Sequence, residues 1–143
     1  MMMAKRAISL DIGDRTVGVA VSDLLGMTAQ GVETIRRTTL DADIARIIEL
    51  MKEYDTNKIV SGYPRNMNGS EGSRCEFVKE FCGALQEAYP EADIEFWDER
   101  LSTVAATRSL LEADVSRKKR KKVIDKMAAV YILQGWLDRQ SRF

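Results

Sequence analysis

Residues 6–23, which read RAISLDIGDRTVGVAVSD, contain two segments in which side chains of two kinds alternate. Alternation with a period of two is typical of a β-strand whose two faces pack against different neighbours. In the second segment, one face carries Val17, Val19 and Val21. The connection between the segments is short, so the stretch predicts an antiparallel hairpin at the start of the fold.

The other face of this hairpin carries small or polar side chains. They are Ala7, Ser9 and Asp11 in the first segment, and Gly18, Ala20 and Ser22 in the second. Small side chains on two neighbouring strands leave room for a helix to approach closely. We therefore expect a helix to dock on this face.

The rest of the chain predicts a third strand followed by alternating helices and strands. The expected elements are a strand at 27–37, a helix at 40–51, a strand at 57–63, a helix at 73–89, a strand at 92–100, a helix at 102–113 and a final helix at about 121–139. This order predicts an α/β protein with a central mixed sheet of about five strands, the first three antiparallel, flanked by helices. A length of 143 residues fits one domain spanning 1–143.

The composition excludes several kinds of chemistry. The formal net charge is zero, so any affinity for nucleic acid must come from a local patch. The sequence has no histidine and two cysteines, which excludes Ser-His and Cys-His nucleophiles and the usual zinc sites. The apolar segment at 7–10 is too short for a membrane span or a signal peptide, so we expect a cytoplasmic protein without a membrane partner.

The predicted final helix carries one acidic residue on its apolar stripe. The stripe consists of Asp125, Ala128, Ala129, Ile132 and Trp136. Its alanines allow the helix to approach the small-residue face of the hairpin, and Asp125 then points toward the strand end that holds Asp11. The alternative is that Asp125 faces solvent or caps its helix.

A third carboxylate follows the last predicted strand. Asp98 and Glu99 follow two apolar residues at the strand's C-terminal end, where open α/β sheets build their sites, and Glu99 is the candidate. With Asp11 and Asp125 it forms an oxygen-only set, which suits Mg²⁺ or Mn²⁺. The alternative is that Asp98 or Glu99 pairs with Arg100.

Six consecutive cations precede Asp125. They are Arg117, Lys118, Lys119, Arg120, Lys121 and Lys122. On a helix they lie about 4 to 12 Å along the axis from Asp125, which is roughly the reach of neighbouring backbone phosphates. We expect this basic run to contact nucleic acid, together with Arg15 and Arg100; the alternative is a solvated loop.

The segment at 62–72 is rich in glycine, asparagine and proline and predicts a loop. Its backbone has two alternative roles, a cradle for phosphate or a structural turn.

Four segments together resemble the YqgF family of pre-16S ribosomal RNA nucleases, also called Holliday junction resolvase-like. They are LDIGDRTVGVAVSD at 10–23, SGYPRNMNGSEGS at 61–73, DERLSTVAA at 98–106 and SRKKRKKVIDKMAAVYILQGWLD at 116–138. They occur in the family's order and span nearly the whole chain. The resemblance implies a ribonuclease H-like fold, with Asp11, Glu99 and Asp125 as catalytic residues that bind Mg²⁺ or Mn²⁺.

The same resemblance implies a metal-dependent endonuclease that matures the 5′ end of pre-16S ribosomal RNA. Its expected partner is therefore precursor ribosomal RNA, or branched DNA if the chain resolves Holliday junctions instead. A non-catalytic nucleic-acid-binding module and an actin-like nucleotide binder are further alternatives, although the second needs a longer chain. The sequence has no evident dimer motif, so we expect a monomer or weak homodimer.

Overall fold

The computed structural model describes residues 6–66, 68–99 and 117–140, with the backbone alone for 117–126. A central sheet of five strands has the order β3-β2-β1-β4-β5. The strands are β1 (Ile8–Ile12), β2 (Thr16–Ser22), β3 (Ala29–Arg36), β4 (Lys58–Tyr63) and β5 (Asp93–Asp98). Strands β1, β2 and β3 pair antiparallel, whereas β4 pairs parallel with both β1 and β5. The predicted mixed sheet with three antiparallel strands is confirmed.

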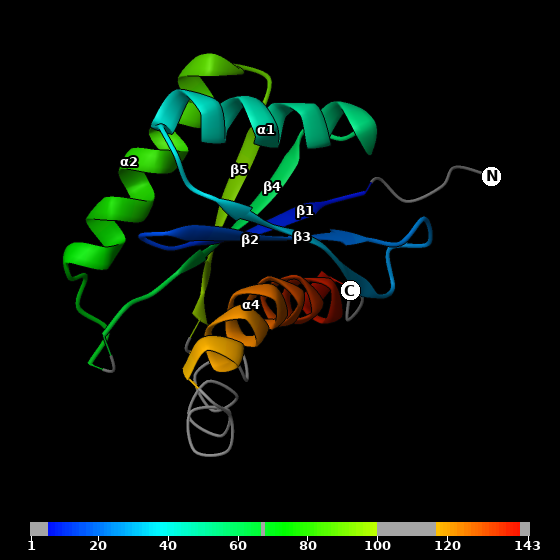
Figure 1. Ribbon diagram of the computed structural model, residues 1–143. Helices are drawn as coiled ribbons and strands as arrows, with labels where there is room; N and C mark the ends of the chain where they lie inside the picture. The colour runs from blue at the N-terminus through cyan, green and yellow to red at the C-terminus, as the bar shows by residue number, and fades with distance from the viewer. Residues whose placement is uncertain (1–5, 67, 100–116, 141–143) are drawn as a thin grey trace.

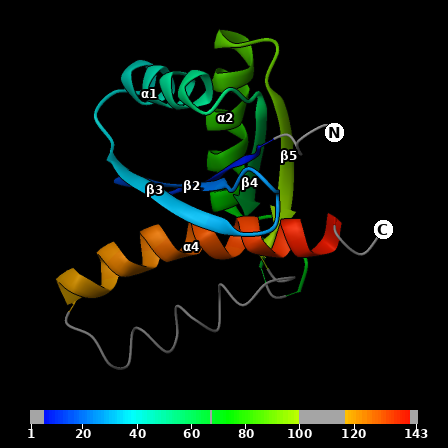
Figure 2. The same ribbon diagram turned by 90° about the vertical axis from the view of Figure 1, so that its right-hand side faces the viewer.

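Three described helices cover the two faces of this sheet. They are α1 (Leu40–Glu53), α2 (Ser73–Ala88) and α4 (Arg117–Gln140). Helices α1 and α2 lie on one face, and α4 lies across the other (Figures 1 and 2). The predicted helix at 102–113 lies outside the described residues.

The alternation of side chains in the hairpin separates two hydrophobic cores. Val17, Val19 and Val21 belong to the core under α1 and α2. Ala7 and Ala20 belong to the core under α4. The prediction that the small-residue face receives the last helix is therefore confirmed.

Helix α4 differs from the prediction in two respects. It begins at Arg117 rather than near 121, because lysine and arginine are good helix formers and extend the helix through the basic run. Its buried face includes Leu133 and Leu137 in addition to Ala128, Ala129 and Ile132 of the predicted stripe, and Trp136 is partly buried against them. Within the described part of the chain, no helix is long and apolar enough to cross a membrane.

Candidate nucleic-acid cleavage site

Asp11 lies on β1 in the face that α4 covers. Its partner in the antiparallel pairing is Gly18, which has no side chain to crowd it. Two residues earlier on the same face, the Ser9 hydroxyl donates to the Ala129 carbonyl of α4 over 2.6 Å. Asp11 is 8% exposed, so its carboxylate is held in a largely water-excluded position between the sheet and the helix.

Helix α4 runs in the opposite direction to β1. Ala129 contacts the middle of β1 through Ser9, whereas Gln134 accepts from the backbone N–H of Ala29 and donates to the Met27 carbonyl. Residues 27–29 lie at the end of the sheet where β1 begins, because the Ser22 N–H bonds to the Ala7 carbonyl there. The N-terminal half of α4 therefore extends toward the end of β1 that carries Asp11 (Figure 1).

This direction determines where the backbone of residue 125 lies. From 129 back to 125 the helix axis advances about 6 Å, and from Ser9 to Asp11 the strand advances about 7 Å. The helix also crosses the sheet, since Ile132 lies over Gly62 of β4. Its direction places position 125 toward the end of β1 that carries Asp11. The side chain of Asp125 itself lies outside the described residues.

Glu99 lies at a small space on the face of the sheet that α4 covers. This space, the Gly62 gap, exists because Gly62 has no side chain. Gly62 on β4 pairs with Trp97 on β5, and Trp97 belongs to the core under α4. A Cβ atom added to Gly62 would lie 3.0 Å from Glu99 Oε1 and 2.6 Å from Ile132 Cδ1. The Glu99 carboxylate thus occupies the space that a side chain at position 62 would fill, on the face that α4 covers.

The pairing of β1 with β4 places Asp11 on the strand next to Gly62, so Asp11 adjoins the space that the Glu99 carboxylate occupies. Leu10 pairs with Ser61, so the next positions along the parallel strands are Asp11 and Gly62. Glu99 is 8% exposed, as Asp11 is. Two largely buried carboxylates therefore face α4 at the C-terminal ends of three neighbouring strands.

This donor set suits a hard divalent cation. Carboxylate oxygens are the ligands that Mg²⁺ and Mn²⁺ prefer, and buried carboxylates are favourable where a cation balances their charge. Among the residues whose side chains are described, no group of three or more acidic or thiol side chains is placed to hold a metal. The expected third member is Asp125, whose side chain is not among them.

A partly buried ion pair supports the turn that follows Asp11. Arg37 Nε lies 3.0 Å from Asp43 Oδ2, and Asp43 is 2% exposed. Arg37 also donates through Nη1 to the Gly13 carbonyl over 3.0 Å and through its N–H to the Arg15 carbonyl over 2.8 Å. The sequence interpretation missed this pair, although Asp43 adjoins Ile44 on the apolar side of the predicted helix at 40–51.

The predicted substrate contacts are only partly described. The Arg15 side chain is exposed on the turn between β1 and β2. The basic run, 117–122, forms the first turns of α4, but its side chains lie outside the described residues, as does Arg100. The backbone of the whole run is helical, although the prediction began the helix near 121, and the contacts of the run stay a prediction.

The described part of the 62–72 loop favours the structural turn over the phosphate cradle. The N–H groups of Arg65, Asn66, Gly69 and Ser70 all donate within the segment, to Tyr63, Ser70, Asn66 and Asn68. Gly69 has a φ of 86°, a left-handed conformation that glycine adopts without strain. Backbone donors that already close a turn do not also form an anion cradle.

The chain matches one protein family over residues 5–139, and that family is described as "RuvX: Holliday junction resolvase". A protein of Clostridioides difficile (strain 630) named "Putative pre-16S rRNA nuclease" is 61% identical over 137 residues, which are 96% of each chain. A protein of the same name from Clostridium perfringens (strain SM101 / Type A) is 55% identical over 137 residues, 96% of this chain and 99% of that protein.

A solved structure shares the fold at low sequence identity. It is "T. thermophilus RuvC in complex with Holliday junction substrate", with a TM-score of 0.60 and 11% identity over 96% of this chain and 97% of that chain. Identity this low supports the fold alone, and the fold agrees with the ribonuclease H-like expectation.

Proposed function

Because this chain belongs to the family described as RuvX Holliday junction resolvases, we propose that it is a divalent-metal-dependent nuclease that trims precursor 16S ribosomal RNA. The observation that carries the proposal is the pair of buried carboxylates, Asp11 and Glu99, on one face of the sheet next to Gly62. Two carboxylates of like charge on one buried face repel each other, and a divalent cation held between them offsets that repulsion.

In this proposal Asp11, Glu99 and Asp125 hold Mg²⁺ or Mn²⁺. The metal, when bound, supplies charge stabilisation at the phosphodiester and a water of lowered pKa as nucleophile. Asp11 is the central ligand, since it lies between position 125 of α4 and the Gly62 gap. The docking of Ala128 and Ala129 on the small-residue face fixes the helix that carries Asp125.

Arg15 and the basic run are proposed to bind the substrate backbone. Arg15 extends from the turn after Asp11, and 117–122 precede Asp125 on α4. In the sequence, Arg15 therefore closely follows Asp11, and the basic run closely precedes Asp125. Their contacts with phosphates orient the scissile bond without reading sequence.

The preference for RNA rests on the names of the C. difficile and C. perfringens relatives, and the alternative substrate is a four-way DNA junction. A junction resolvase must cut two symmetry-related strands, so it needs two active sites facing one substrate, and a two-fold dimer provides them. An RNA-trimming nuclease needs one site. We therefore propose that this protein is cytoplasmic and acts as a monomer or a weak homodimer.

Paired cleavage assays test the proposal. The purified chain and Asp11→Asn are incubated in Mg²⁺ or Mn²⁺ with a labelled precursor carrying single-stranded 16S flanks, and with a labelled four-way DNA junction. We expect the parent to cut the RNA flank, to cut the junction poorly, and to lose RNA cleavage in Asp11→Asn.

Light scattering at micromolar concentration is the companion measurement. A stable dimer that makes symmetric paired nicks in the junction and leaves the RNA intact would replace the ribosomal proposal with junction resolution. Absence of cleavage on both substrates, with tight binding retained, would favour the non-catalytic binding module.

A further inference from the structure

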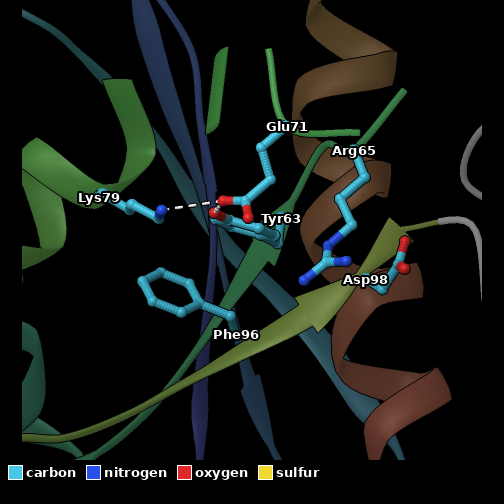
Figure 3. A pocket seen from close by; sticks show the side chains of 6 residues that line it. All are labelled: Tyr63, Arg65, Glu71, Lys79, Phe96 and Asp98. Carbon is cyan, nitrogen blue, oxygen red and sulfur yellow. Dashed lines mark hydrogen bonds and ion pairs between the residues drawn. The ribbon is translucent and has the colours of Figure 1, made fainter. Parts of the chain in front are cut away.

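A second candidate site borders the C-terminal ends of β4 and β5 on the face opposite α4. It is a pocket of about 480 Å³. Its lining residues are Tyr63, Arg65, Glu71, Lys79, Phe96 and Asp98 (Figure 3). The volume lies within the range of pockets that hold small molecules.

The pocket and the carboxylates share the same two strand ends. Tyr63 and Asp98 pair across β4 and β5, one position beyond Gly62 and Trp97. Successive side chains of a strand point to opposite faces. The residues that line the pocket therefore alternate along the chain with those beside Glu99. A single strand of nucleic acid that passes over this end of the sheet can reach both sites.

The floor of the pocket is aromatic. The Phe96 side chain is 41% exposed on the edge strand β5. The ring of Tyr63 lies 4.9 Å away between centroids, tilted by 41°, and Tyr63 is 5% exposed. Among the described residues, the other large exposed hydrophobic side chains are aliphatic. Phe96 thus presents a ring backed by a second ring, which is an arrangement on which a nucleobase stacks.

The charges around this floor are partly balanced. Lys79 Nζ lies 2.8 Å from Glu71 Oε1, and the Tyr63 hydroxyl also donates to Glu71. The hydrogen bond from Lys79, followed by that from Tyr63, lowers the pKa of the Glu71 carboxyl, so this group is ionised at neutral pH. The charge of Lys79 is therefore neutralised within the pocket wall.

Arg65 is the second cation of the pocket. Its charge contributes to lowering the pKa of Glu71, and Asp98 also lines the pocket. Its guanidinium carbon lies 5.4 Å from the Tyr63 ring centroid, and it forms no salt bridge with a described residue. Figure 3 shows its guanidinium extending over the pocket between Tyr63 and Asp98. A planar guanidinium binds phosphate through two parallel hydrogen bonds.

We propose that this pocket binds one unpaired nucleotide of the substrate, with its base against Phe96 and a phosphate at Arg65. An aromatic floor next to a guanidinium that has no salt bridge to a described residue matches the two parts of a nucleotide. The assignment rests on the proposed nuclease function and adds that the enzyme selects single-stranded flanks, because a base within a duplex has no free face to stack.

Binding assays without divalent metal test the pocket separately from catalysis. A fluorescein-labelled single-stranded RNA of twelve nucleotides is titrated with the parent, Phe96→Ala, Phe96→Leu and Arg65→Gln in EDTA. Leu25→Ala and Lys52→Gln are matched controls, since both side chains are exposed and lie away from the pocket. Thermal unfolding confirms that each variant is folded.

We expect Phe96→Ala to raise the Kd by about 5- to 150-fold, the range for loss of one stacked base. Phe96→Leu should lose most of the same affinity, because leucine keeps apolar bulk without a π-face. The plot of log K against log salt has a negative slope, and Arg65→Gln should make that slope less negative by about 0.7. The two controls should bind as the parent does, and a blunt duplex RNA should be insensitive to Phe96→Ala.

A strand with 2-aminopurine at the unpaired position reports stacking directly. Its fluorescence should fall on binding to the parent and not on binding to Phe96→Ala. If the parent cleaves RNA while the Phe96 and Arg65 variants bind it unchanged, the pocket assignment is wrong and the nuclease proposal stands. If the pocket variants weaken binding but the parent never cleaves, the pocket stands and the nuclease proposal is wrong. Pocket dependence on a DNA strand of the same sequence, with none on RNA, would overturn the RNA assignment.

Discussion

Substitution of Gly62 separates the position of the Glu99 carboxylate from the stability of the fold. In Gly62→Ala, the new Cβ would lie 2.6 Å from Ile132 Cδ1 and 3.0 Å from Glu99 Oε1. Ordinary carbon contacts are about 3.5–4.0 Å, so the Ile132 methyl must retreat by about 1 Å and the Glu99 oxygen by a few tenths of an ångström. Both atoms are the ends of side chains, which can move while the strand stays in place.

The expected loss of stability is small for this reason. Overpacking costs about 1–3 kcal/mol, and replacing a strand glycine with alanine returns about 0.5–1 kcal/mol. We expect a net loss of roughly 0.5–2 kcal/mol in the free energy of unfolding. Activity should fall by up to about 10-fold in kcat/KM, because a misplacement of about 1 Å at a reacting centre can cost a hundredfold and the Glu99 oxygen moves by a few tenths of that distance.

The assay combines urea unfolding with cleavage of the labelled RNA flank. Two companion variants isolate the cause. Ile132→Val removes Cδ1 and with it the closer of the two contacts. The double variant Gly62→Ala/Ile132→Val should therefore lose no more unfolding free energy than the sum of the losses in the two single variants. It should stay impaired in cleavage, because Glu99 is still displaced. Gly83→Ala in α2 is the control, since its added Cβ meets nothing within 4 Å. It should be more stable by about 1 kcal/mol and fully active. A Gly62→Ala protein with parental cleavage would refute the reasoning that the gap holds the Glu99 carboxylate in place.

Three further predictions concern other parts of the molecule. Ala128→Leu, between α4 and the sheet, should cost about 1–3 kcal/mol of stability and up to roughly a hundredfold in rate, and a parental protein by both measures would mean that the helix does not dock there. Changing Lys118, Lys119 and Arg120 to alanine should weaken RNA binding for all sequences and flatten the salt slope by up to about 0.7 per lost contact, whereas an unchanged slope would make the run a solvated surface. Burial raises the pKa of Cys82 to about 11, and Cys75 is also buried, so a thiol reagent at pH 8 should label the protein only in denaturant; rapid labelling of the native chain would contradict the burial of these two thiols.

The parts of the fold that sequence predicted are those specified by local periodicity. Alternation in the hairpin distinguished the valine face from the small-residue face. The valine face packs in the core under α1 and α2, and the small-residue face packs under α4, as predicted for the last helix. The alanines of α4 identified the helix that docks under Asp11. These are properties of one or two adjacent segments, so a single sequence contains the information for them.

The features that sequence did not predict depend on register between distant segments. The gap beside Glu99 exists because Gly62 pairs with Trp97 and because Ile132 of α4 packs over it. The sequence placed Gly62 at the end of a predicted strand, but it did not indicate which side chains pack against it. The bond from Arg37 to the Gly13 carbonyl likewise joins residues 24 positions apart, and the pocket at Phe96 combines β4, β5, α2 and the loop before α2.

The central claim is that three carboxylates act together in metal-dependent cleavage. Single-turnover cleavage of the RNA flank in Mg²⁺ tests it most directly, with Asp11→Asn, Glu99→Gln and Asp125→Asn compared with the parent. Asp138→Asn is the matched control, because Asp138 is an exposed acid on the same helix as Asp125. We predict that each of the three variants stays folded and loses divalent-dependent cleavage while the control retains it. Near-parental turnover in any one of the three would remove that residue from the site and contradict the account.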